Sequence, residues 1–145
     1  MDLSEIYTEL IAEHSNNKEN KHEMDNPTIR LRGVNPSCGD DIELMLRVED
    51  GVISDASFTG IGCAISQAST SMMIDDIKGK TLKEAEALLT TFIGMIQREV
   101  TDPARIDTLG EAAALQNVSN MPARVKCAVL PWRTLENAIH EEQGK

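Results

Sequence analysis

The chain of 145 residues is acidic, with 24 aspartates and glutamates against 14 lysines and arginines and a formal net charge of −10 at pH 7. This balance argues against a nucleic-acid ligand, because phosphate binding needs a basic surface. No apolar run approaches the roughly 20 residues that cross a bilayer, which argues against a membrane protein. The length suits a single compact domain over residues 1–145.

The N-terminal region predicts a helix followed by a loop. Apolar residues recur at helical spacing over residues 2–14, and the polar stretch 15–23 predicts an exposed loop. The first residues are acidic and lack the features of a signal peptide, so we expect a cytoplasmic protein. Since His14, His22 and His140 lie far in sequence from the cysteines, we expect them on helix surfaces or in solvent.

A three-stranded antiparallel sheet is predicted next. Residues 28–32 and 42–48 alternate between apolar and polar side chains, and a third strand is expected over 52–58. Asp50 and Gly51 separate the second and third strands, and an Asp-Gly pair is a strong signal for a tight hairpin because glycine tolerates positive φ.

Two helices are predicted after the sheet. The first covers residues 64–78 and ends at Gly79. The second begins with a capping box, in which the Thr81 side chain accepts from the Glu84 amide while Glu84 reaches back. An apolar stripe continues along this helix to Ile96.

The C-terminal third predicts two more helices. A Thr-Asp-Pro sequence at 101–103 breaks the preceding helix, and an Ala-rich helix follows over 109–117. The last helix is expected to start near Ala128, because Pro131 lacks an N–H and suits a first turn. Cys127 then lies at or just before the helix N-terminus. Together these elements predict an α+β fold, with a three-stranded antiparallel sheet packed against about five helices.

The three cysteines each lie in a turn or near a predicted helix start. Cys38 lies in Asn-Pro-Ser-Cys-Gly-Asp, Cys63 in Gly-Ile-Gly-Cys-Ala and Cys127 in Arg-Val-Lys-Cys-Ala. If the thiols converge in space, Asp40 can supply a fourth donor to a metal site. Zn²⁺ accepts cysteine sulfur and aspartate oxygen, whereas iron–sulfur clusters usually take four thiolates. The alternative is three unrelated buried cysteines, although turn contexts disfavour burial.

A basic segment surrounds the third cysteine. Residues 121–133 contain Arg124, Lys126 and Arg133 and no acid. These cations and the positive end of a helix are expected to lower the pKa of Cys127, and the start of a helix should act in the same way on Cys63. For Arg124 two roles are equal alternatives: its charge tunes the cysteine site, or it is an ordinary solvated surface residue.

Three motifs in order resemble the U-type iron–sulfur cluster assembly family, which includes the NifU N-terminal and IscU-like domains. They are residues 35–40, residues 58–66 (Phe-Thr-Gly-Ile-Gly-Cys-Ala-Ile-Ser) and residues 124–127. The resemblance runs over nearly the whole chain. It implies an α+β sandwich and implies that the metal or cluster ligands are Cys38, Asp40, Cys63 and Cys127.

Departures from the IscU-like branch favour the SufU branch. Lys126 replaces the histidine that precedes the third cysteine in the IscU-like branch, and residues 121–125 do not match the Leu-Pro-Pro-Val-Lys motif read by an Hsp70-type chaperone. Between Cys63 and Cys127 the chain is longer than in the IscU-like branch, and residues 101–116 are the expected insertion. The SufU branch binds zinc and accepts sulfur from a SufS-type cysteine desulfurase.

The resemblance therefore implies a zinc-dependent sulfurtransferase that accepts persulfide sulfur, with Cys38 as the acceptor and Cys127 as second choice. The partners expected are a SufS-type desulfurase and a downstream Suf scaffold or apo-protein acceptors. One alternative is a non-enzymatic scaffold on which iron and sulfur form a [2Fe–2S] cluster for transfer to apo-proteins. A purely structural zinc domain is the third possibility. It is disfavoured because the predicted strands and capped helices suggest a core that is stable without metal.

Overall fold

The computed structural model describes the backbone of residues 3–144 and the side chains of residues 9–144. The elements of the described chain are α1 (Leu3–Asn16), β1 (Ile29–Asn35), the 3₁₀ helix η1 (Pro36–Cys38), β2 (Asp40–Glu49), β3 (Val52–Ile61), α2 (Ala64–Ile77), α3 (Leu82–Ile96), α4 (Pro103–Asp107), the 3₁₀ helix η2 (Gly110–Asn120) and α5 (Pro122–Gln143). The predicted α+β fold is confirmed. The first helix was predicted from residue 2, which lies outside the described residues.

The sheet has the order β1-β2-β3 and is antiparallel throughout. Ile29 pairs with Leu46, and Leu44 pairs with Phe58. The predicted hairpin between β2 and β3 is confirmed, since Asp50 and Gly51 have φ of 53° and 77°. Positive φ at both central residues characterises the hairpin turns that match strand twist.

The strands extend beyond their predicted ends toward the cysteines. β1 continues to Asn35 and β2 begins at Asp40, and these two residues pair. The η1 turn that carries Cys38 is therefore a short connection between two paired strand ends. Gly39 ends this turn with φ of 70°, a conformation that costs glycine nothing.

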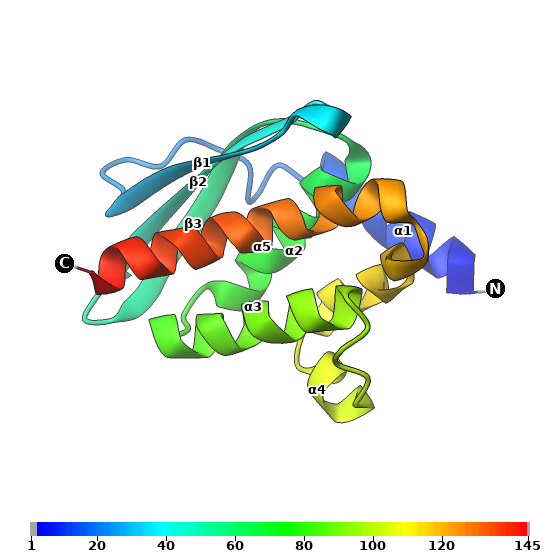
Figure 1. Cartoon of the computed structure of the whole chain (residues 1–145). Coiled ribbons are helices and arrows are strands. Elements are labelled where there is room, and N and C mark those ends of the chain that lie inside the picture. Colours follow the sequence, from blue (N-terminus) through cyan, green and yellow to red (C-terminus); the bar gives the residue numbers. More distant parts are fainter. Residues whose placement is uncertain (1–2, 145) are drawn as a thin grey trace.

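The helices cover one side of the sheet in layers (Figure 1). α5 packs on β1 and β2, α2 packs on α5 and β3, and α3 packs on α5. Trp132 of α5 is fully buried and stacks on Phe92 of α3, with ring centroids 4.4 Å apart. Its indole N–H donates to Ser69 Oγ at 3.0 Å, and Ser69 donates to the Ala128 carbonyl at 2.6 Å. Apolar stacking and a satisfied polar contact thus fix α5 against both neighbours.

The two helices after the sheet begin as predicted, and each ends before its predicted limit. α2 ends at Ile77, before Gly79 with φ of 81°. The capping box is complete, because the Glu84 amide donates to Thr81 Oγ1 at 3.0 Å and the Thr81 amide donates to Glu84 Oε1 at 3.0 Å.

The predicted start of the last helix is wrong. α5 begins at Pro122, and Pro131 lies inside it. Pro122 satisfies the first-turn preference that was assigned to Pro131, whose missing N–H leaves the Cys127 carbonyl without its usual helical donor. Cys127 therefore lies in the helix interior and not at its positive end.

The segment before α5 also differs from its prediction. The Ala-rich helix is a 3₁₀ helix over Gly110–Asn120, and the short helix α4 was not predicted. The residues predicted only to break the preceding helix also carry the start signal of α4: Asp102 accepts from the Ala104 amide at 3.0 Å, and Pro103 occupies the first turn.

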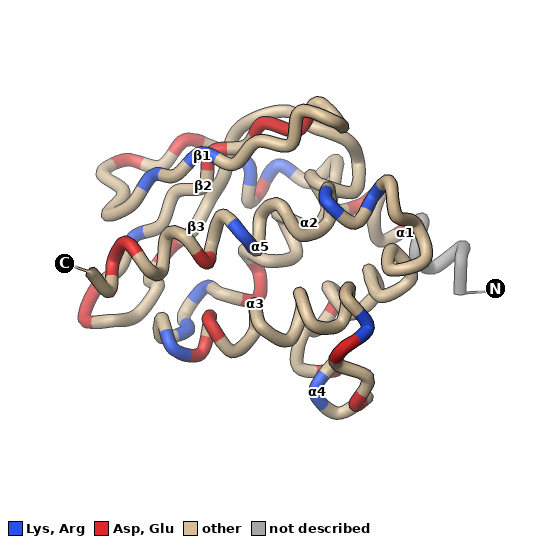
Figure 2. Tube along the Cα trace, viewed as in Figure 1, with Lys and Arg blue, Asp and Glu red and all other residues tan. Residues whose placement is uncertain are grey.

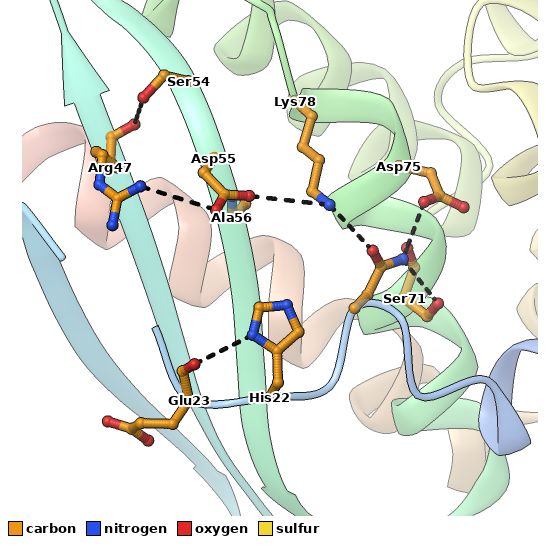
Figure 3. A network of polar contacts seen from close by, with 10 residues as sticks. His22, Glu23, Arg47, Ser54, Asp55, Ala56, Ser71, Asp75 and Lys78 are labelled. Carbon is orange, nitrogen blue, oxygen red and sulfur yellow. Dashed lines mark hydrogen bonds and ion pairs between the residues drawn. The ribbon is translucent and has the colours of Figure 1, made fainter. Parts of the chain in front are cut away.

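The polar stretch after α1 is not wholly exposed. Asn20 is buried, and its side-chain amide donates to the Ser71 carbonyl at 3.1 Å and to Asp75 Oδ1 at 2.9 Å (Figure 3). His14 is also buried, contrary to the predicted surface position. No helix in the described part of the chain is long and apolar enough to span a membrane.

The capping box gives a first prediction about stability. Replacing Thr81 with Ala removes the acceptor for the Glu84 amide and should lower the free energy of unfolding by about 1 kcal/mol. Urea denaturation measures this change. Thr101→Ala is the matched control, since Thr101 is exposed outside any helix, and an equal loss in both variants would contradict the capping role.

Candidate metal centre

The predicted site residues come together at one end of the molecule. The β1–β2 connection, the start of α2 and the first turns of α5 meet there (Figure 1). The ligand atoms of Cys38, Asp40 and Cys127 all lie within 4.8 Å of one another. The Cys63 sulfur is not within 4.8 Å of all three of these atoms, although it is close enough to raise the pKa of the Cys127 thiol.

Asp40 is buried at the centre of this group, with 1% of its surface exposed. Its Oδ1 accepts from the Cys63 amide at 2.9 Å and from Ser66 Oγ at 3.0 Å. Its Oδ2 accepts from the Asn35 side-chain amide at 3.2 Å. Three donors on two segments therefore compensate the buried carboxylate and fix its orientation. No specific role for Ser66 or Asn35 was predicted from the sequence.

Gly62 is what allows the carboxylate to lie so close to the start of α2. A Cβ at this position would lie 2.6 Å from Asp40 Oδ1 and 2.4 Å from Ser66 Oγ. Both distances are shorter than any real contact, so the glycine before Cys63 is a requirement of packing around Asp40. Sequence reasoning noted glycines near the cysteines but could not show what they approach.

Cys63 lies at the N-terminus of α2, as predicted. It is the N-cap residue, and its sulfur accepts from the Ser66 amide at 3.4 Å. Ser66 therefore contacts both the sulfur of Cys63 and the carboxylate of Asp40. The side chain of Cys63 is half-buried.

Cys127 is fully buried, unlike the position its turn context predicted. Burial raises the pKa of its thiol, and the neighbouring Cys38, Cys63 and Asp40 groups add to the effect. The predicted lowering of this pKa is therefore wrong, because desolvation and nearby acidic groups outweigh the basic segment. A bound cation reverses this balance, since a coordinating thiol is deprotonated.

Arg124 is exposed and faces the sulfur atoms. Its interactions with the sulfur of Cys127, and then with Cys63 and Cys38, raise the pKa of the guanidinium. The first turns of α5 carry basic residues and no acidic ones (Figure 2). Two basic side chains, Arg124 and Lys126, therefore lie at this end of a strongly acidic chain.

A cavity of about 570 Å³ opens beside the group, and Cys38 is the cysteine that lines it. The lining residues are Ser37, Cys38, Pro122, Ala123, Arg124 and Lys126. The Cys38 sulfur lies 3.7 Å from the Ala123 carbonyl oxygen. Cys38 and Cys63 are both partly exposed, and Cys38 is the one of the two that lines this cavity.

Three large apolar side chains remain exposed around this end. They are Val34, Ile61 and Met121, with exposed fractions of 45%, 71% and 40%, and they are the large apolar side chains found exposed in the described chain. Val34 and Ile61 both pair with Asp41, on opposite sides of β2. Exposed apolar side chains rimmed by polar groups are typical of protein interfaces.

The donor set fits zinc. Three cysteine sulfurs and one carboxylate oxygen are ligands that Zn²⁺ accepts in four-coordinate sites. In the described residues one other group brings three possible ligands together, and it contains no sulfur. Cys38, Asp40 and Cys127 are therefore the sulfur-containing candidate group for a metal among the described residues.

Comparison with known proteins agrees with this fold. Residues 6–144 match the family model of the NifU-like N terminal domain. The chain is 42% identical over 142 residues to the zinc-dependent sulfurtransferase SufU of Bacillus subtilis (strain 168), covering 98% of this chain and 95% of that protein. It is 40% identical over 134 residues to the iron-sulfur cluster assembly scaffold protein IscU of Thermotoga maritima, covering 92% of each.

Solved structures show the same architecture. The crystal structure of FiSufU from Fervidobacterium islandicum AW-1 superposes with a TM-score of 0.86 at 39% identity, covering 93% of this chain and 97% of that one. The N-terminal NifU-like protein of Brucella abortus shares the fold, with a TM-score of 0.86 at 23% identity and 99% of each chain covered. The family model spans nearly the whole sequence, and the chain therefore belongs to the NifU-like N-terminal domain family, with SufU and IscU proteins among its relatives.

Proposed function

We propose that this protein accepts persulfide sulfur from a SufS-type cysteine desulfurase at a zinc site and so supplies sulfur for iron–sulfur cluster assembly. The observation that carries the proposal is the convergence of Cys38, Asp40 and Cys127 beside a cavity with a basic mouth. The 42% identity to a zinc-dependent sulfurtransferase supports it.

The zinc ligands in this proposal are Cys38, Asp40, Cys63 and Cys127. The bound ion supplies the positive charge that keeps the thiols deprotonated. Asn35 and Ser66 hold the Asp40 carboxylate in place through their hydrogen bonds.

Cys38 is the acceptor we favour. It lines the cavity and is partly exposed, whereas Cys127 is fully buried and Cys63 caps α2. Its position between two paired strand ends lets a partner approach the sulfur without displacing a helix or strand.

The transfer needs no oxidant or reductant. The Cys38 thiolate attacks the outer sulfur of the partner's cysteine persulfide, and a new S–S bond forms. The S–S bond of the partner breaks, and its electron pair leaves with the partner's cysteine as a thiolate. Arg124 faces the sulfurs, and its charge stabilises the anionic groups during this exchange.

The surroundings of the site suit a protein partner. Val34, Ile61 and Met121 offer exposed apolar contacts, and Arg124 and Lys126 offer positive charge. An apolar surface with acidic residues on the desulfurase would complement both. Free cysteines fit the reducing cytoplasm that we propose for this exchange.

A scaffold function is the second candidate. The 40% identity to an IscU scaffold protein favours it, because the same four side chains could hold a [2Fe–2S] cluster as cargo before its transfer to apo-proteins. Lys126 argues for the first candidate, because the IscU-like branch of the family has histidine at this position and the departure resembles the SufU branch.

Replacing Cys38 with Ala tests the acceptor assignment. We expect transfer of labelled sulfur from desulfurase and cysteine to fall by about 100-fold, because the nucleophile is lost. Stimulation of the desulfurase should fall with it. Ser37→Ala is the matched control on the same turn.

Full labelling of the Cys38→Ala protein would refute Cys38 as acceptor. If the wild type fails to stimulate the desulfurase and instead forms a stable, visibly coloured cluster after anaerobic reconstitution, the scaffold function replaces the first proposal.

Replacing Gly62 with Ala tests the support of the metal site. The added Cβ displaces Asp40 or Ser66, so zinc affinity should fall by about 10- to 100-fold while the helical content is retained. Competition with a chromophoric chelator measures the affinity. The control is Gly144→Ala, whose Cβ meets nothing nearer than 3.4 Å; equal affinities in the two variants would contradict the packing argument.

Replacing Ile61 with Lys tests the docking surface. The concentration of this protein that half-maximally stimulates the desulfurase should rise about tenfold, because an exposed apolar contact is lost. Zinc content should not change. Ala104→Lys places the same charge on exposed α4, and an identical response in both variants would rule out a specific role for Ile61.

A further inference from the structure

A second group of possible metal ligands lies away from the cysteines. The ligand atoms of His14, Asp75 and Glu111 lie within 4.8 Å of one another. Asp75 lies 12 residues beyond Cys63 (75 − 63) along α2, which is about 18 Å along the helix axis at about 1.5 Å per residue. The group is therefore separate from the cysteine centre.

Buried polar side chains orient two of these ligands. His14 is 4% exposed, and its Nδ1 lies 3.0 Å from Ser71 Oγ. The side-chain amide of Asn20 donates to Ser71 Oγ at 3.2 Å and to Asp75 Oδ1 at 2.9 Å. Figure 3 shows Ser71 and Asp75 on α2 joined to this shared amide. A buried hydroxyl and a buried amide thus direct the imidazole and the carboxylate, as outer-sphere groups do around metal ligands.

The third ligand, Glu111, comes from a different element of the fold. Glu111 lies in the first turn of η2, and its Oε1 is 3.3 Å from His14 Nε2. When Nδ1 of His14 carries the proton and donates to Ser71, the lone pair on Nε2 faces the Glu111 oxygen. In this tautomer the Nε2 lone pair and the Glu111 oxygen can bind one cation together, whereas a proton on Nε2 makes the same contact a hydrogen bond.

The charge around the group is negative. Asp75 and Glu111 supply the negative charge of the group, and the buried Oδ2 of the neighbouring Asp76 has no hydrogen-bond partner among the described residues. The amino group of Lys78 contacts Asn20 Oδ1 at 3.3 Å and Asp55 at 3.9 Å, and Lys80 is exposed. His14 and Asp75 also lie in the last turns of α1 and α2, where helix dipoles favour a cation.

We propose that His14, Asp75 and Glu111 bind a first-row divalent metal ion at a site distinct from the cysteine centre. One imidazole nitrogen and two carboxylate oxygens form a sulfur-free ligand set, which suits Mn²⁺, Fe²⁺ or Zn²⁺. The bound ion joins the end of α1 to α2 and η2, three elements that are far apart in sequence.

Manganese binding to protein that carries one equivalent of zinc tests this site, because that zinc occupies the cysteines and leaves the sulfur-free ligands open to Mn²⁺. Loss of the six-line electron paramagnetic resonance signal of free Mn²⁺ measures uptake, and we expect about one ion per chain. Glu111→Gln and Asp75→Asn should each weaken binding at least about tenfold. Both side chains are exposed, and the Asn substituent still offers an acceptor to Asn20, so both variants should fold.

Glu13→Gln is the matched control, because it removes the same charge from an exposed position next to His14 on α1. It should bind Mn²⁺ like the wild type. Absence of uptake at millimolar Mn²⁺ would overturn the proposal. Uptake that survives both ligand substitutions, or that falls equally in the control, would overturn it too.

Discussion

The buried carboxylate of Asp40 is the interaction on which the cysteine centre depends. It accepts from Asn35 at the end of β1 and from the Cys63 amide and Ser66 hydroxyl at the start of α2. A buried charge is tolerated only when donors compensate it, so these segments must meet in one arrangement. Two of the cysteines follow from this arrangement, since Cys63 donates its own amide and Cys38 precedes Asp40 by two residues in the same turn.

Cys127 reaches the same place through a different constraint. Its helix is positioned by Trp132, which stacks on Phe92 and donates to Ser69, and by the contact from Ser69 to the Ala128 carbonyl. Ala128 directly follows Cys127, so packing of α5 against α2 and α3 sets the depth of the third sulfur. The position of the cysteine centre is therefore set by two things: the hydrogen bonds to Asp40 at the end of the sheet, and the apolar packing of α5 in the helical layer.

This division explains which features the sequence could predict. Asp50-Gly51 and the Thr81–Glu84 capping box are local signals, and both occur as predicted. The start of α5 was not decided locally, because Pro122 and Pro131 both satisfy the preference for a first turn. Tertiary packing selects Pro122 and tolerates Pro131 inside the helix, and with that choice Cys127 becomes a buried residue.

Burial of His14 depends on residues still farther away in sequence. Its ring contacts Ser71 and Glu111, which follow it by 57 and 97 positions. No periodicity within α1 reveals these partners, so a surface histidine was the natural expectation from sequence alone. The motif for Cys38, Asp40, Cys63 and Cys127 was recognisable for the opposite reason, since each residue lies in a short segment of characteristic neighbours.

The charge distribution limits how a partner can find the proposed sulfur-accepting site. The chain carries a formal charge of −10, whereas Arg124 and Lys126 lie at the mouth of the cavity. At physiological ionic strength, charges separated by more than about 8 Å are largely screened. The overall negative charge therefore weakly opposes an acidic partner at long range, and the basic mouth acts only near contact. Recognition must then depend on short-range fit, in which the apolar side chains of Val34, Ile61 and Met121 select the surface that brings a persulfide to Cys38.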